Sequence, residues 1–311
     1  MRVSFNAFSN RLVDTLGDLA SRQMRYQIQA STGQRIVNPE DDPGAMRRVL
    51  DLQDEGARVG QYQRNVTRLK ELTTATYGVL RGLSRVSDRA GEIATKADAT
   101  RSPQELSVMG REVTQLIEQA VSAANTTNRG DALLGGTKTS QAPYVLTKDA
   151  DGRVIGVEFR GNTETSQMEI SEGETVVANA VGTNVAGSGA PGIITDPRTG
   201  ADFFNHLIDL QNRLLSGDTA GIAATTRPAL QKDSDNLLIQ LSSNATLQSR
   251  LEAATAAASS RSTSIETQVS NEADADLAQT LVKLNETQLA YQAALQTSGK
   301  ILSMSLLDYI R

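Results

Sequence analysis

Few residues in this 311-residue chain could carry catalytic chemistry. The chain has no cysteine and a single histidine, His206, which lies between Phe204 and Leu207 in an amphipathic segment. A Ser-His-Asp triad would need this histidine as its base, whereas its apolar setting favours a structural role. Without cysteine, thiolate nucleophiles, thiolate metal sites and disulfides are excluded.

Two other stretches contain residue types that bind ions or phosphates. Glu40, Asp41 and Asp42 could hold a cation, but helix capping explains acids beside Pro43 more simply. Residues 130–139 are rich in glycine, yet Lys138 does not directly follow a glycine and no apolar strand precedes the stretch, as a phosphate-binding loop requires. We therefore predict that the protein is not an enzyme, with no catalytic residue, no cofactor and no metal.

Charge and hydropathy narrow the classes of partner. The net charge is −5, and residues 139–202 hold nine acids against four bases. This balance lacks the basic footprint of a nucleic-acid-binding protein. No apolar run approaches the length of a membrane span, and the first residues contain no continuous apolar stretch of the kind found in a secretory signal peptide. We expect neither nucleic acid nor membrane as a partner, and any export must use another route.

The elements that position these residues are mostly helices. The chain has no Trp and only 4% aromatic residues, so it suits the thin seams of an elongated helical bundle better than a thick globular core. Apolar positions at four- and three-residue steps predict a long helix over 59–94 and a further helix after Ser102. Gly33, Pro39 and Pro43 break the chain before the long helix.

A change of period predicts an insert between the helices. Tyr144–Leu146 and Val154–Phe159 flank Asp151-Gly152, which is a strong hairpin signal, and further short strands are expected at 167–170 and 174–177. Residues 187–200 are predicted to be a loop because glycine and proline mark them. Helical spacing returns at Phe203, with Pro228 expected to begin or bend the next long helix.

The fold class is thus mainly α with a small β insert. We expect an elongated helical-bundle stem, with the N- and C-terminal helices pairing as a coiled coil at one end and a β-rich outer domain at the other. The predicted divisions are a first helix with its linker at 1–40, long stem helices at 41–136, the outer domain at 137–202, returning stem helices at 203–272, and a C-terminal helix at 273–311.

Both terminal helices have a narrow apolar stripe with coiled-coil spacing. Residues 1–35 carry a net charge of plus three and residues 272–311 a net charge of minus two, which weakly favours their pairing. Since a pair of such helices is marginal in water, we expect both to order only on assembly. The predicted assembly interface comprises Phe5, Phe8, Leu12, Leu19, Leu281, Leu284, Tyr291, Leu295, Leu302, Leu306 and Leu307. An ordinary amphipathic helix on a globular core is the alternative interpretation.

Several motifs resemble the flagellin-like family. The segment 29–43, QASTGQRIVNPEDDP, resembles its N-terminal signature, and Asp274-Ala-Asp276-Leu-Ala resembles the start of its C-terminal helix. Pro39 and Pro43 around the acidic pair, the stretch 134–139 and the ending 305–310 resemble the branch that joins hook to filament more than flagellin itself. One departure is Ala132-Leu133-Leu134, where the family usually has aromatic residues before Gly-Gly.

This resemblance implies a structural role in the bacterial flagellum. It implies a ring homo-oligomer between hook and filament, with hook-associated protein 1 on one side and flagellin on the other. It also implies unfolded export by the flagellar type III system to the extracellular flagellum, after an export chaperone has held the C-terminal helix. Two alternatives are a flagellin that builds the filament itself and an enzyme hosted on the β insert, although no nucleophile–base pair or metal constellation supports the latter.

Overall fold

The structure is a computed structural model that describes the backbone of residues 2–309 and the side chains of residues 10–300. It divides into two compact units, which we describe separately. The terminal unit comprises Met1–Arg58 together with Ser260–Arg311, and the central unit comprises Val59–Ser259. Phe5, Phe8, Leu302, Leu306 and Leu307 of the predicted interface lie outside the described side chains.

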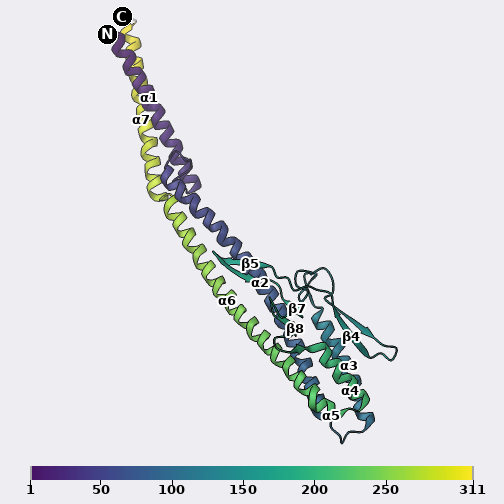
Figure 1. The fold of residues 1–311 in the computed structure, drawn as a ribbon. Coiled ribbons are helices and arrows are strands. Elements are labelled where there is room, and N and C mark those ends of the chain that lie inside the picture. The colour runs from purple at the N-terminus through teal and green to yellow at the C-terminus, as the bar shows by residue number, and fades with distance from the viewer. Residues whose placement is uncertain (1, 310–311) are drawn as a thin grey trace. The chain divides into compact units, whose positions relative to one another are not determined.

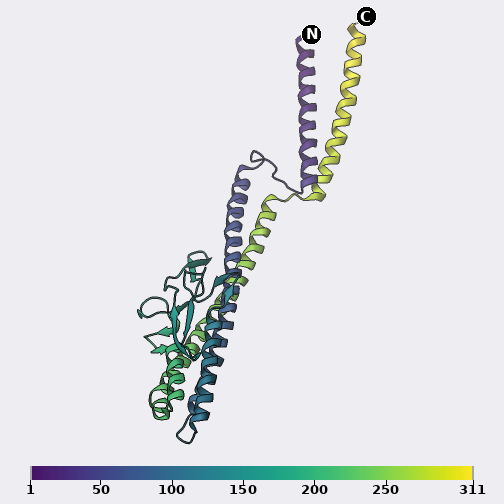
Figure 2. The same cartoon turned by 90° about the vertical axis from the view of Figure 1, so that its right-hand side faces the viewer.

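Helices form the terminal unit. Helix α1 (Arg2–Thr32) packs along α7 (Leu277–Tyr309), and the two ribbons run beside each other in Figures 1 and 2. The unit also includes the first part of α2 (Pro43–Lys96) and the last part of α6 (Arg227–Ala273). The predicted pairing of the N-terminal and C-terminal helices is therefore confirmed.

The central unit contains the rest of α2 and α6 and four shorter helical segments. Helix α3 (Pro103–Ala124) begins with the predicted Ser102 cap, whose hydroxyl accepts the Glu105 N–H while the Glu105 carboxylate accepts the Ser102 N–H. Helix α4 (Phe203–Ser216) ends at Gly217, whose left-handed backbone is typical of a glycine at a helix C-terminus. A short helix α5 (Thr219–Gly221) and a π-helical turn η1 (Ile222–Thr226) lead directly into α6.

One apolar core fills the space between these helices and the strands that lie beside them (Figure 2). Fully buried leucines come from three helices, and the Tyr144 ring packs against Phe204 with 5.2 Å between centroids. A smaller cluster lies beneath the strands β5 and β6, around Leu69, Ile170 and Leu251. The main buried side chains are Leu80, Leu83, Ile117, Phe203, Leu207, Leu210 and Leu214.

The β insert consists of small separate sheets. Antiparallel pairs join β1 (Thr127–Asn128) to β2 (Asp131–Ala132), β3 (Tyr144–Lys148) to β4 (Val154–Phe159), and β5 (Gln167–Ser171) to β6 (Glu174–Val177). A three-stranded sheet has the order β7 (Val181–Thr183), β8 (Gly192–Asp196), β9 (Ala201–Asp202). The hairpin expected over 144–159 is present, and the short strands expected at 167–170 and 174–177 are β5 and β6, which pair with each other.

One local prediction was wrong. Residues 187–200 are not a continuous loop, because β8 lies within them and pairs in parallel with β7. The buried Asp196 carboxylate stabilises this turn by accepting the Gly192 N–H at 2.9 Å and pairing with Arg198, which lowers the pKa of Asp196 to about 2. Pro228 is the second residue of α6, so it lies at the start of the next long helix as predicted, and helical backbone already precedes it through η1.

The architecture is mainly α with a small β-rich insert, and this predicted fold class is confirmed. Among the described residues, no helix is long and apolar enough to cross a membrane.

Candidate assembly surface

The single histidine belongs to the core of the central unit. His206 Nδ1 lies 2.8 Å from Asp233 Oδ2, and the other Asp233 oxygen accepts the Asp202 N–H at 2.8 Å. The hydrogen bond from Asp233 raises the pKa of His206, while burial raises the pKa of Asp233. Because this pair joins α4 to α6 and no serine or threonine hydroxyl is recorded on the ring, its geometry is that of a structural link.

The acidic residues near position 41 cap backbone, as the sequence predicts. Asp41 Oδ2 accepts the N–H groups of Val37 and Asn38 at 3.1 and 2.9 Å, and Asp42 Oδ1 accepts the Ala45 N–H at 3.0 Å at the start of α2. These backbone hydrogen bonds lower the pKa of both carboxyls. Their lone pairs are thus used by the chain itself, which explains the acids without a cation.

The glycine pair at 135–136 is explained by close packing. A Cβ atom on Gly135 would lie 2.3 Å from the Lys138 carbonyl oxygen, and one on Gly136, whose φ is +67°, would lie 2.2 Å from that of Asn162. The Asn162 N–H donates to the Gly135 carbonyl, and its side chain accepts the Thr137 N–H at 2.8 Å. In this stretch, backbone segments therefore pack so closely that only glycine fits.

No group of three or more metal-ligating side chains occurs within the part of the chain that the structure describes. Exposed apolar side chains, which are suited to contacts between proteins, occur on the terminal helices.

Small polar residues form much of the inner face between α1 and α7. Thr280, Thr287 and Ser298 of α7 are buried, and they recur with coiled-coil spacing. The hydroxyls of Thr287 and Ser298 donate to carbonyl groups four residues earlier, at 2.7 and 2.5 Å, so they are satisfied within their own helix. Small side chains allow close approach of the helices but bury little apolar surface, so this inner face contributes modestly to stability.

The predicted interface residues divide between two faces of the terminal helices. Leu12, Leu19, Leu284 and Tyr291 are half-buried, in line with the inner face. Leu281 and Leu295 instead remain 50% and 45% exposed. The sequence stripe therefore does not lie on the inner face as a whole.

Further exposed apolar side chains accompany those two leucines. Five of them fall outside the four- and three-residue stripe, so sequence reasoning missed them, although their presence on mostly polar helix faces was a usable signal. Leu277 begins the stripe but was not among the predicted interface residues. Leu289 is the most exposed of the α7 group at 67%. The set comprises Val13, Met24 and Ile28 on α1 and Leu277, Val282 and Leu289 on α7.

The linkers that connect the terminal helices to α2 and α6 are tied together. Gln34 and Asp274 form an antiparallel bridge, flanked by hydrogen bonds from the Arg35 N–H to the Ala273 carbonyl at 2.7 Å and from the Ala275 N–H to the Gly33 carbonyl at 2.8 Å. Gly33 has a φ of +73°, which only glycine adopts at little cost. The exit from α1 and the entry to α7 are thereby fixed to each other.

Arginine side chains reinforce this connection. Arg35 donates to the Glu272 carbonyl oxygen at 2.6 Å, and Arg48 makes a two-point ion pair with the Glu272 carboxylate at 3.0 and 2.8 Å. Arg25 of α1 pairs with Asp41. Most of these groups are exposed, so the pairs add little stability and mainly fix geometry.

Comparisons with known proteins agree with a flagellar origin. The bacterial flagellin N-terminal helical region matches residues 3–139. Flagellar hook-associated protein 3 of Escherichia coli strain K12 is 25% identical over 235 residues, covering 73% of this chain and 72% of that protein. The protein of the same name from Salmonella typhimurium strain LT2 is 22% identical over 326 residues and covers 100% of both chains.

Solved structures share the fold. A structure from Vibrio parahaemolyticus, described as a flagellar hook-associated protein, superposes with a TM-score of 0.61 at 20% identity, covering 75% of this chain and 100% of that one. The relatives are flagellar components, which supports a place in the flagellum for this chain. The predicted resemblance is confirmed: the chain is similar to flagellar hook-associated protein 3, and its residues 3–139 match the bacterial flagellin N-terminal helical region.

Proposed function

We propose that this chain assembles through α1 and α7 into a ring that joins the flagellar hook to the filament. The observation that carries the proposal is the distribution of side chains on the helix pair. Threonine and serine occupy the inner face, whereas leucines such as Leu281, Leu289 and Leu295 face outward. Such a pair is incomplete as an isolated structure and suits contact with neighbouring subunits.

The energetics favour several weak contacts over one strong one. Complete burial of a leucine side chain contributes about 1.5–3 kcal/mol, so the half-exposed leucines of each copy contribute a few kcal/mol before ordering costs are subtracted. A closed ring gives every copy two neighbours, which multiplies these contributions. Two isolated copies would therefore associate only weakly, and a copy would bind firmly only where several neighbours contact it at once.

The proposed partners follow from this position. They are further copies of the chain, hook-associated protein 1 on one side and flagellin on the other. We also propose export through the flagellar type III system, with a chaperone bound to the C-terminal helix beforehand. The role is structural rather than enzymatic, in keeping with the use of His206, Asp41 and Asp42 inside the fold.

A deletion strain tests the proposal. Electron microscopy should show hooks without filaments, with unassembled flagellin in the medium, and re-expression of this chain should restore the filaments. Normal filaments in the deletion strain would refute the junction role. A filament subunit is the alternative, and it predicts that the purified chain polymerises alone into long filaments.

A further inference from the structure

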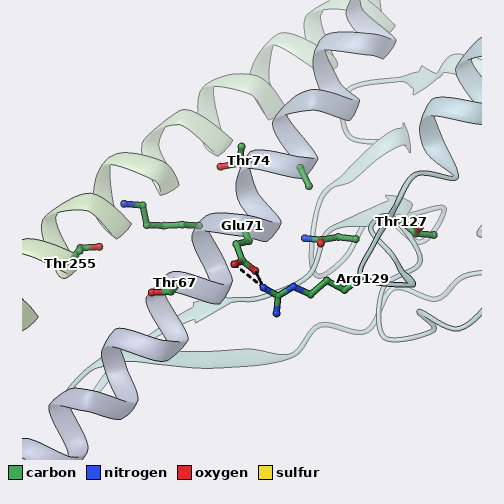
Figure 3. A pocket seen from close by; sticks show the side chains of 9 residues that line it. Thr67, Glu71, Thr74, Thr127, Arg129 and Thr255 are labelled. Atoms are coloured by element: carbon green, nitrogen blue, oxygen red, sulfur yellow. Dashed lines mark hydrogen bonds and ion pairs between the residues drawn. The ribbon is translucent and has the colours of Figure 1, made fainter.

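An open groove of about 660 Å³ lies along α2 in the central unit (Figure 3). Thr67, Lys70 and Thr74 of α2 form one wall, and Thr255 of α6 and the β1–β2 turn form the others. A neighbouring hollow shares Arg129 with the groove and extends it along α2 to Arg64 and Arg68. Most of its lining residues are polar or charged, but apolar atoms form most of its exposed surface, and Ala75 of its lining also packs against the main apolar core.

This part of α2 has an excess of positive charge. Residues 59–87 contain five bases and one acid, Glu71, a net charge of plus four. Helical spacing of 11 and 15 residues places Lys70, Arg81 and Arg85 on one face. Among the residues that the structure describes, carboxylates make no ion pair with any of the five bases, which are Arg64, Arg68, Lys70, Arg81 and Arg85.

The one acid in residues 59–87, Glu71, already makes an ion pair. Glu71 pairs with Arg129 at 2.8 Å, and Figure 3 shows this contact across the groove. Arg129 lies in the tight β1–β2 turn with a φ of +55°, a left-handed conformation that costs about 1–2 kcal/mol for a residue with a side chain. The turn thus adds a further arginine, 75% exposed, instead of neutralising the groove.

The opposite charge is found on the β insert of the same chain. Residues 139–202 carry a net charge of minus five. Among the side chains that the structure describes, the exposed Glu172 at the β5–β6 turn makes no ion pair, and Glu158 pairs only with Arg160 two residues away. Within one copy, the described ion pairs therefore leave both the basic groove and the acidic insert with unbalanced charge.

We propose that the α2 groove is the lateral docking surface for the acidic β insert of a second copy. The proposal rests on the proposed function, because a ring places copies side by side. Groove and insert are different surfaces of one chain, so the contact is head to tail, which is the kind of contact that generates rings. Complementary charge would set the register of neighbours and disfavour wrong pairings.

Charge exchange in the full chain tests this proposal in a strain that lacks its own copy. Arg68→Glu with Lys70→Glu should lower the number of copies on purified hooks about tenfold, since like charges would then face each other. Glu158→Lys with Glu172→Lys should do the same. The chain with all four changes should recover to within about twofold of wild type, because complementarity is restored with reversed sign.

Arg111→Glu is the matched control, because Arg111 is an exposed base on α3 that makes no recorded ion pair. Wild-type incorporation of Arg68→Glu/Lys70→Glu would overturn the proposal. So would a four-change chain no better than either double variant, which would indicate that the groove binds another partner. If wild type itself does not occupy the junction, the proposed function fails, and that result is distinguishable from failure of the groove alone.

Cross-linking guards against variants that merely fail to fold. The chain has no cysteine, so introduced cysteines react uniquely. In flagella built from a Lys70→Cys chain and an epitope-tagged Glu172→Cys chain, a short bis-maleimide should produce a tagged dimer of the two. Arg111→Cys paired with Glu172→Cys should produce none. No dimer from the first pair in assembled flagella would overturn the proposal.

Discussion

The core of the central unit and the inner face of the α1–α7 pair are filled by opposite kinds of side chain. In the core, α4 buries Phe203, Leu207 and Leu210 almost completely. In the helix pair, α7 buries Thr287 and Ser298 and leaves Leu289 and Leu295 exposed. The first region is completed by its own chain, while the second has its apolar side chains available to something outside it. The difference supports the proposal that folding and assembly depend on separate parts of the sequence.

The largest expected effect on this difference between the two regions comes from Leu295→Asp. A charge on the exposed face of α7 should abolish incorporation at the hook. Contact with a neighbouring subunit would bury an unpaired carboxylate, which is unfavourable. Gln296→Asp, one residue along the helix, is the control and should be tolerated. The measurement is the number of filaments per cell by electron microscopy, and filaments joined normally by the Leu295→Asp chain would remove this residue from the interface.

A leucine pair compares the two regions by stability. Leu210→Ala should lower the free energy of unfolding of the central unit by about 2–5 kcal/mol, because Leu210 is fully buried and its removal leaves a cavity. Leu289→Ala should change it by no more than about 0.5 kcal/mol, since that side chain is exposed. Urea unfolding measures both, and equal losses would show that the two leucines are equally part of a folded core.

Stability of the central unit should depend on pH through His206. Because Asp233 raises the pKa of His206 in the folded state, the stabilisation is fully present below the unfolded value of about 6.5 and is lost as pH rises through the folded pKa. Asp202 and Asp209 also face the ring and act in the same direction.

His206→Gln provides the comparison for this pH effect. Wild type should lose roughly 1.5 kcal/mol more than the variant between pH 6 and pH 9, the scale of a charged hydrogen bond. Thermal unfolding at a series of pH values measures the difference. Parallel curves for the two proteins would show that the pair contributes no linked stability.

The smallest expected effect concerns the inner face of the α1–α7 pair. Thr287→Val keeps the shape of a buried side chain and removes a hydroxyl, so it should stabilise the α1–α7 pair by about 0.5–1 kcal/mol. Thr297→Val removes the same kind of internal hydrogen bond, 2.8 Å from Thr297 to the Ala293 carbonyl, at an exposed position. Amide hydrogen exchange of α7 should slow in the first variant only, and equal exchange in both would argue against a buried inner face at Thr287.

Much of the fold was predictable because its signals are local. The Ser102 cap, the Gly217 helix end and the Asp151-Gly152 hairpin each depend on a few neighbouring residues with definite backbone preferences. The parallel pair β7–β8 was missed because glycines surround Gly192–Asp196 and the pairing partner is separate in sequence. The buried hydrogen bonds of Asp196 that hold this region cannot be recognised from spacing alone.

The candidate surface was predictable only in part, for a geometric reason. Two lines of positions run along α7, one through 277, 281 and 295 and the other through 280, 287 and 294. Leu284 and Tyr291 lie beside both lines. Hydrophobicity favours turning the leucines inward, but the structure turns the small residues toward α1, where close approach is possible. Which face of α7 meets α1 depends on both helices together. The α2 groove likewise depends on the whole fold, because it forms only when Arg129 and Thr255 lie close to Lys70.

The bridge between Gln34 and Asp274 has a mechanical consequence. The two main-chain hydrogen bonds beside it, and the Arg35 contact to Glu272, act across both linkers at once. A pull on α1 is therefore transmitted to α7 as well, and the bonds share the load instead of breaking one after another. Torque reaching one terminal helix is divided between two chain segments, which protects each from being peeled away alone.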